Sequence, residues 1–98
     1  MIHSLADLES GKLIGIKRLK LACGLNHFPL EILELADSLE ILDLSDNNLS
    51  ELPESIVQLK KMKIIFFANN NFKVFPKNLA SCPNLSMIGF KSNQIHTT

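Results

Sequence analysis

The sequence repeats at a spacing of 23 residues, and this period restricts the possible folds more than any other feature. The stretch LEILDLSDNNLSELP begins at Leu39, and its apolar, Asn and Pro positions recur in MKIIFFANNNFKVFP, which begins at Met62. One period later the pattern returns in LSMIGFKSNQI, which begins at Leu85. A period of this length indicates stacked units, because one such unit cannot bury its own apolar side chains.

Within one repeat, the spacing of apolar residues predicts a short strand, a turn and a helical return. Leu42 and Leu44 alternate with polar residues, so a strand would bury the leucines and expose their neighbours. In ELPESIVQLKKM, the residues Ile56, Leu59 and Met62 fall three apart and form one apolar stripe. We therefore expect a parallel sheet on one side and short helical segments on the other.

The turn after each predicted strand contains an asparagine. A buried Asn side chain can both donate to and accept from backbone groups of neighbouring turns, so we expect a hydrogen-bond ladder along the stack. Its predicted members are Cys23, Asn47, Asn70 and Asn93, with Cys23 taking the asparagine's place in a first repeat whose turn is one residue shorter. Cys23 and Cys82 are both predicted to be buried, separate thiols.

These positions resemble the motif L-x-x-L-x-L-x-x-N/C-x-L of the leucine-rich repeat family over roughly residues 13–98. The resemblance implies an α/β solenoid of about four repeats, with a concave parallel β-sheet and short helical or irregular convex segments. Residues 1–12 are predicted to form an N-terminal helical cap, with Ser4 at its start and Gly11 at its end. Residues 13–98 then form the repeats, of which the last is incomplete.

Side chains that point outward from the strands predict a binding surface on the concave sheet. Three of the four residues in one outward row are apolar, and basic residues flank them. Aromatic, Met and Arg side chains are common anchors in protein interfaces. The alternative is that a parallel sheet tolerates such residues for strand propensity alone. The predicted partner-binding residues are Arg18, Lys20, Ile41, Asp43, Ile64, Phe66, Met87 and Lys91.

Composition excludes several other classes of function. Ten basic residues balance ten acidic ones, which argues against a nucleic-acid or membrane partner. His3, His27 and His96 are scattered, and no metal-binding, phosphate-binding or catalytic motif occurs, so we expect no cofactor, no metal and no enzyme activity. The start MIHSLADLESGK lacks the features of a secretory signal, which predicts a cytoplasmic location.

The function expected from these features is protein–protein interaction, through a protein or peptide bound on the concave face. Residues 11–45 and the stretch CPNLSMIGFKSNQI also resemble the N-terminal repeat region of bacterial leucine-rich-repeat-linked protein kinases. That resemblance implies a recognition or regulatory segment of a larger serine/threonine kinase, although the 98 residues contain no kinase motif. A third hypothesis is a structural element that self-associates by stacking through its uncapped C-terminal repeat.

Overall fold

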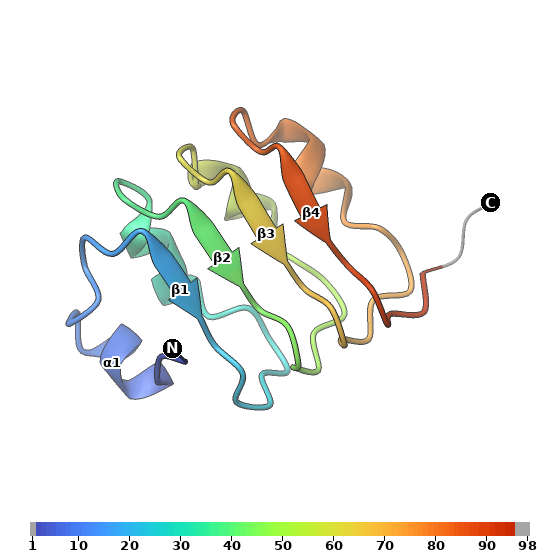
Figure 1. Cartoon of the computed structure of the whole chain (residues 1–98), viewed down its shortest axis with the longest axis horizontal. Helices are drawn as coiled ribbons and strands as arrows, with labels where there is room; N and C mark the ends of the chain where they lie inside the picture. The colour runs from blue at the N-terminus through green and yellow to red at the C-terminus, as the bar shows by residue number, and fades with distance from the viewer. Residues whose placement is uncertain (1, 96–98) are drawn as a thin grey trace.

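The computed structural model describes residues 2–95 and has four short parallel strands in one open sheet. The strands lie side by side in chain order, and one helical segment behind the sheet connects each strand to the next (Figure 1). This arrangement confirms the predicted α/β solenoid. The elements are α1 (Leu5–Glu9), β1 (Arg18–Lys20), η1 (Leu30–Leu35), β2 (Ile41–Asp43), η2 (Glu54–Gln58), β3 (Ile64–Phe66), η3 (Lys77–Ser81) and β4 (Met87–Gly89).

The register of the sheet follows the 23-residue period. Arg18 pairs with Ile41, which pairs with Ile64, which pairs with Met87. The last positions of the strands form a second row of Lys20, Asp43, Phe66 and Gly89. Between these rows, the central residue of each strand points to the core, so the sheet has one buried and one open face.

The return segments η1, η2 and η3 are 3-10 helices. A 3-10 helix has three residues per turn, so apolar residues spaced three apart fall on one side of it. Ile56 and Leu59 are both fully buried for this reason. A proline precedes each of the three helices and provides a backbone φ near −70° at its start.

The N-terminal segment lies against the first repeat. The Ser4 hydroxyl oxygen accepts a hydrogen bond from the Asp7 N–H at 3.1 Å, as expected for an N-cap. Gly11 follows the helix with a φ of +81°, a conformation that glycine adopts without strain. Leu8 is buried in the core.

His3 has a structural role that the sequence did not reveal. Its backbone N–H donates to the Lys20 carbonyl at 2.7 Å, and its Nδ1 accepts from the Lys20 N–H at 3.1 Å. These two bonds satisfy backbone groups at the outer edge of β1, where no further strand pairs with it in the sheet. A side-chain nitrogen thus replaces a backbone acceptor, which no strand pattern predicts.

The prediction that both cysteines are buried is correct for Cys82 and wrong for Cys23. Cys82 is 6% exposed, and burial raises the pKa of its thiol. Cys23 is an exposed free thiol. In the later repeats, the residue just before the ladder Asn has positive φ, whereas in the shorter first turn that conformation falls on Gly24, after Cys23. The thiol therefore points to solvent, and Cys23 contributes only its backbone N–H to the ladder.

Candidate functional site on the concave sheet

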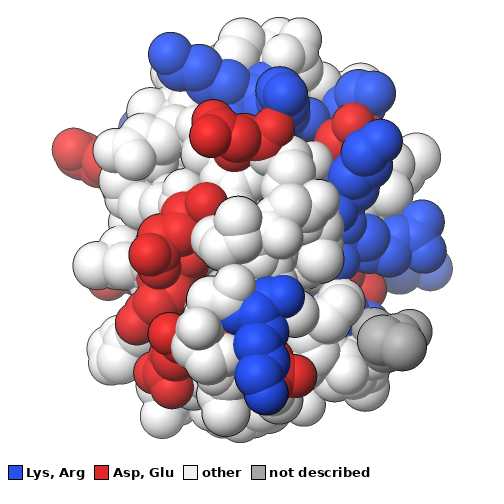
Figure 2. Space-filling model, turned by 90° about the vertical axis from the view of Figure 1, so that its left-hand side faces the viewer, with Lys and Arg blue, Asp and Glu red and all other residues white. Residues whose placement is uncertain are grey.

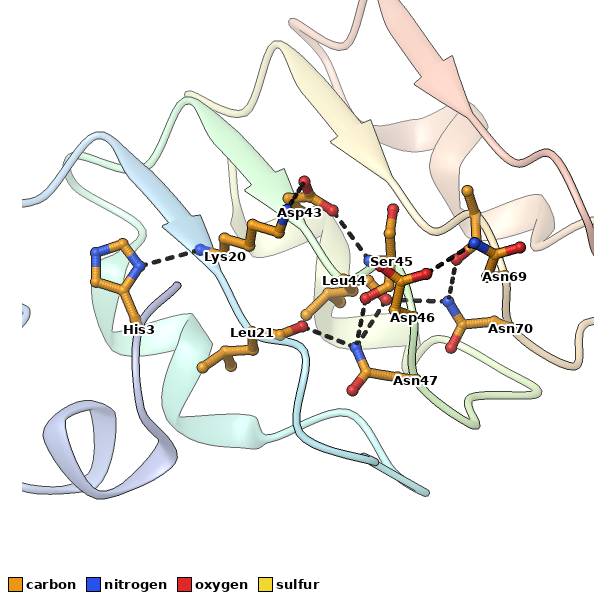
Figure 3. A network of polar contacts seen from close by, with 11 residues as sticks. His3, Lys20, Leu21, Asp43, Leu44, Ser45, Asp46, Asn47, Asn69 and Asn70 are labelled. Carbon is orange, nitrogen blue, oxygen red and sulfur yellow. Dashed lines mark hydrogen bonds and ion pairs between the residues drawn. The ribbon is translucent and has the colours of Figure 1, made fainter. Parts of the chain in front are cut away.

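The asparagine ladder holds the turns at the ends of the strands (Figure 3). Asn47 Nδ2 donates to the carbonyls of Leu21 and Leu44, both at 2.8 Å, and Asn47 Oδ1 accepts from the N–H groups of Cys23 and Leu25. Each ladder side chain thus ties its own turn to the repeat before it. Asn70 is 5% exposed and repeats the arrangement one period later.

The last ladder residue, Asn93, makes the same kinds of bond in a more open position. Its Nδ2 donates to the carbonyls of Phe67 and Phe90, both at 3.0 Å, and its Oδ1 accepts from the Phe72 N–H. The side chain is only half-buried. The ladder holds the turns that follow the strands and leaves the outward face of the sheet free.

Residues from all four strands line one hollow of about 470 Å³ on the open face of the sheet. The hollow is formed by seven of the eight predicted partner-binding residues, namely Arg18, Lys20, Ile41, Asp43, Ile64, Phe66 and Met87. The structure does not place Lys91 in its lining; Lys91 is exposed beyond the end of β4. The parallel register brings together residues that are up to three repeats apart in the sequence.

Apolar side chains from β2, β3 and β4 line most of the hollow. Ile41, Ile64 and Phe66 are half-buried, and Met87 is 52% exposed. The Phe66 ring lies against Gly89: a Cβ added at Gly89 would stand 2.6 Å from Phe66 Cδ1. The absence of a side chain at Gly89 therefore leaves room for the Phe66 ring beside β4.

Gly89 was not among the predicted binding residues, although it occupies one of the outward rows. A glycine inside a strand often marks a close approach by another group. That signal was present in the sequence, because Gly89 stands where the other repeats have Lys20, Asp43 and Phe66. The sequence did not indicate that the Phe66 ring would occupy the space beside Gly89.

The β1 and β2 side of the hollow is charged. Lys20 Nζ lies 3.9 Å from Asp43 Oδ2, and Asp43 Oδ1 also accepts a hydrogen bond from the Ser45 N–H at 3.0 Å. The Asp43 carboxylate is thus engaged within the chain. The ion pairs formed within residues 2–95 are Lys12–Asp7, Lys20–Asp43 and Lys63–Glu40, and Arg18 takes part in none of them.

Charge is unevenly distributed around the molecule. Figure 2 looks at the end that carries α1 and shows Lys and Arg mainly along the top and right, and Asp and Glu mainly along the left. The right side of Figure 2 corresponds to the front of Figure 1, where the open face of the sheet lies. Glu31 and Glu34 belong to η1, behind the sheet. Although the chain has no net charge, basic side chains at this end lie mainly toward the open face of the sheet.

The lining of the hollow is mostly apolar, with charged side chains at its β1 end. In residues 2–95, no three His, Cys, Asp or Glu side chains come together as metal ligands. The part of the chain that the structure describes also contains no helix long and apolar enough to cross a membrane. The open sheet offers a rigid apolar floor with cations at one end, and these features define a repeat scaffold with a candidate binding surface.

The chain belongs to the leucine-rich repeat family, because the profile of that family, described as "Leucine rich repeat", matches residues 37–95. Among solved structures, the chain is similar to a leucine-rich-repeat protein of Leptospira interrogans, with a TM-score of 0.79 and 28% sequence identity. The match covers 99% of this chain and 24% of that protein, so this chain spans about a quarter of its length. Leucine-rich repeat domains generally bind other proteins.

Proposed function

We propose that this chain is a protein-interaction module that binds a protein or peptide partner on its concave face. The main support is the apolar cluster of Ile41, Ile64, Phe66 and Met87, which lies in one hollow on the side of the sheet opposite the core. Burying Met87 and the Phe66 ring would remove apolar surface from water, which favours association. Arg18 and Lys20 at the edge would tune specificity.

The test is a comparison of variants against a peptide selected for binding to the whole chain. Replacing Ile64 and Phe66 together by serine should weaken the binding of that peptide at least about tenfold, because the apolar floor is lost. The circular-dichroism spectrum and the melting temperature should stay nearly unchanged, since neither side chain belongs to the buried core.

A second variant and a matched control make this test specific. Gly89→Ala keeps every apolar side chain but displaces the Phe66 ring, so it should also weaken binding. The control replaces Leu30 and Val74, which are 61% and 68% exposed outside the hollow, by serine. The control should change affinity by less than about twofold. Equal losses in control and test variants, or no loss in either, would place the binding site elsewhere.

A second candidate function is self-association through the last repeat. Phe90 is 42% exposed although it stacks on Phe67 at 6.0 Å between ring centroids. Beside it, Phe75, Leu85 and Ile88 help to line a hollow of about 390 Å³ at this end of the solenoid. A second copy packed here would cover these apolar side chains.

Sedimentation at increasing protein concentration tests this candidate. If the last repeat mediates association, the sedimentation coefficient should rise with concentration, and Ile95→Lys should abolish the rise. Val74→Lys, which adds the same charge at an exposed site outside that hollow, is the control. A monomer at every concentration would contradict self-association.

We also propose, from the resemblance of residues 11–45 and 82–95 to bacterial kinase-linked repeats, that the module recognises a regulator or substrate for a cytoplasmic serine/threonine kinase. The Leptospira protein shows that similar repeats occur within a longer chain. The reading frame of the gene beyond the codon for Thr98 tests this proposal. Phosphate-loop, lysine and catalytic-loop motifs would support it, and an immediate stop codon would contradict it.

A further inference from the structure

We infer that the concave face takes an extended peptide segment in which an acidic side chain stands four residues from a large apolar one. This inference rests on the proposed binding function and adds the chemistry of the partner. It is drawn from the charge left unpaired at one end of the hollow and from the apolar floor at the other.

The charged end has an excess of basic groups. Lys20 is within reach of Asp43, whose carboxylate is also held by the Ser45 N–H. Arg18 is exposed and forms no ion pair within residues 2–95. A guanidinium in this state can bind a carboxylate through two parallel hydrogen bonds, which are stronger than bonds between neutral groups. The complementary group on the partner is therefore an Asp or Glu side chain.

The apolar end needs a different side chain on the partner. Ile64 and Phe66 present partly exposed surface on β3, and Met87 extends from β4 beside them. The Phe66 ring occupies the space that a side chain at position 89 would need. Leu, Ile, Met or Phe on the partner would fit against such a floor.

The distance between the basic and apolar ends of the hollow determines how far apart the acidic and apolar side chains of the partner must be. Adjacent strands are about 4.8 Å apart, so the step from β1 to β3 is about 10 Å and the step from β1 to β4 is about 14 Å. An extended peptide rises about 3.3 Å per residue. Side chains an even number of residues apart point to the same face of an extended peptide. A segment that crosses from β1 to β4 would therefore place its acidic and apolar side chains about four residues apart.

A phage-displayed library of random dodecapeptides, selected on the immobilised full chain, tests this inference. The enriched peptides should carry Asp or Glu four residues from a large apolar residue. Arg18→Glu should weaken their binding at least about tenfold and, in a fresh selection, favour Lys or Arg in place of the acid. Lys77→Glu makes the same change of charge on η3, behind the sheet, and should alter affinity less than about twofold.

The variants separate failure of this inference from failure of the proposed function. Apolar peptides without an acid, whose binding is lost in the Ile64→Ser, Phe66→Ser double variant but unchanged by Arg18→Glu, would overturn the inference and leave the binding surface in place. Peptides that bind the double variant as tightly as the original chain would overturn both. Selected acidic peptides that respond to Lys77→Glu as strongly as to Arg18→Glu would also contradict the inference, because only net charge would matter.

Discussion

Replacing Asn47 by alanine is expected to lower the free energy of unfolding by at least about 3 kcal/mol, since it leaves three backbone groups without their partner and each unpaired buried polar group costs about 1 to 3 kcal/mol. Asn47 Oδ1 accepts from two backbone N–H groups, of Cys23 and Leu25, and its Nδ2 donates to the Leu21 carbonyl at 2.8 Å. All three groups belong to the shorter first turn. The substitution removes their common partner.

The other ladder positions provide the comparison, because their alanine variants leave fewer groups unpaired. Each of the three carbonyls that accept from Asn70 also accepts from a second donor, so mainly the Leu49 N–H would lose its partner. Asn70→Ala should therefore cost about 1 to 3 kcal/mol. Asn93→Ala should cost about 1 kcal/mol, because water can reach this half-buried site.

Urea unfolding of the three variants measures this order. We expect Asn47→Ala to be the least stable, followed by Asn70→Ala and then Asn93→Ala. Equal midpoints for all three, or the reverse order, would show that the ladder does not stabilise the turns as the hydrogen bonds indicate.

Replacing Phe67 by alanine is the second change with a large expected effect, a loss of about 3 to 5 kcal/mol. Phe67 is fully buried, and its ring centroid lies 4.7 Å from that of Phe72 and 6.0 Å from that of Phe90. Removing the ring would leave a cavity between the last two repeats. It would also remove the aromatic surface on which Phe90 packs.

Phe67→Leu is the matched control, because Leu44 fills the equivalent place one repeat earlier. An apolar side chain of similar bulk keeps most of the packing, so its cost should be about 1 kcal/mol. Guanidinium unfolding followed by circular dichroism measures both values. Equal losses for alanine and leucine would mean that the site needs an aromatic ring, whereas a loss below about 1 kcal/mol for alanine would contradict close packing there.

The architecture could be predicted from the sequence because one period controls both the strands and the turns. Leu42 and Ile65 are buried at equivalent places, and the strands pair in the register given by steps of 23 residues. Positions one residue to either side then had to point outward. For this reason the period and the alternation within each strand were enough to place seven of the predicted binding residues on one surface.

The remaining features depend on local geometry that periodicity does not determine. Cys23 lies in the first turn, which is one residue shorter than the others. There the residue with a left-handed backbone conformation is Gly24, and the Cys23 thiol points outward. His3 pairs with Lys20 through a ring nitrogen, which resembles no repeat position. The contact of Phe66 with Gly89 depends on the direction of one side chain. Each of these three features depends on local geometry that is not part of the repeated pattern.

The most direct test of binding on the concave face is the change in backbone amide shifts when ¹⁵N-labelled chain is titrated with the best selected dodecapeptide. Because the selection uses the whole chain, it does not favour any surface. We predict that the largest changes fall on the four strands, at Arg18, Ile41, Ile64, Phe66 and Met87. Changes concentrated at Phe75, Leu85 and Phe90, or on η1 to η3, with the strands unaffected, would contradict the account.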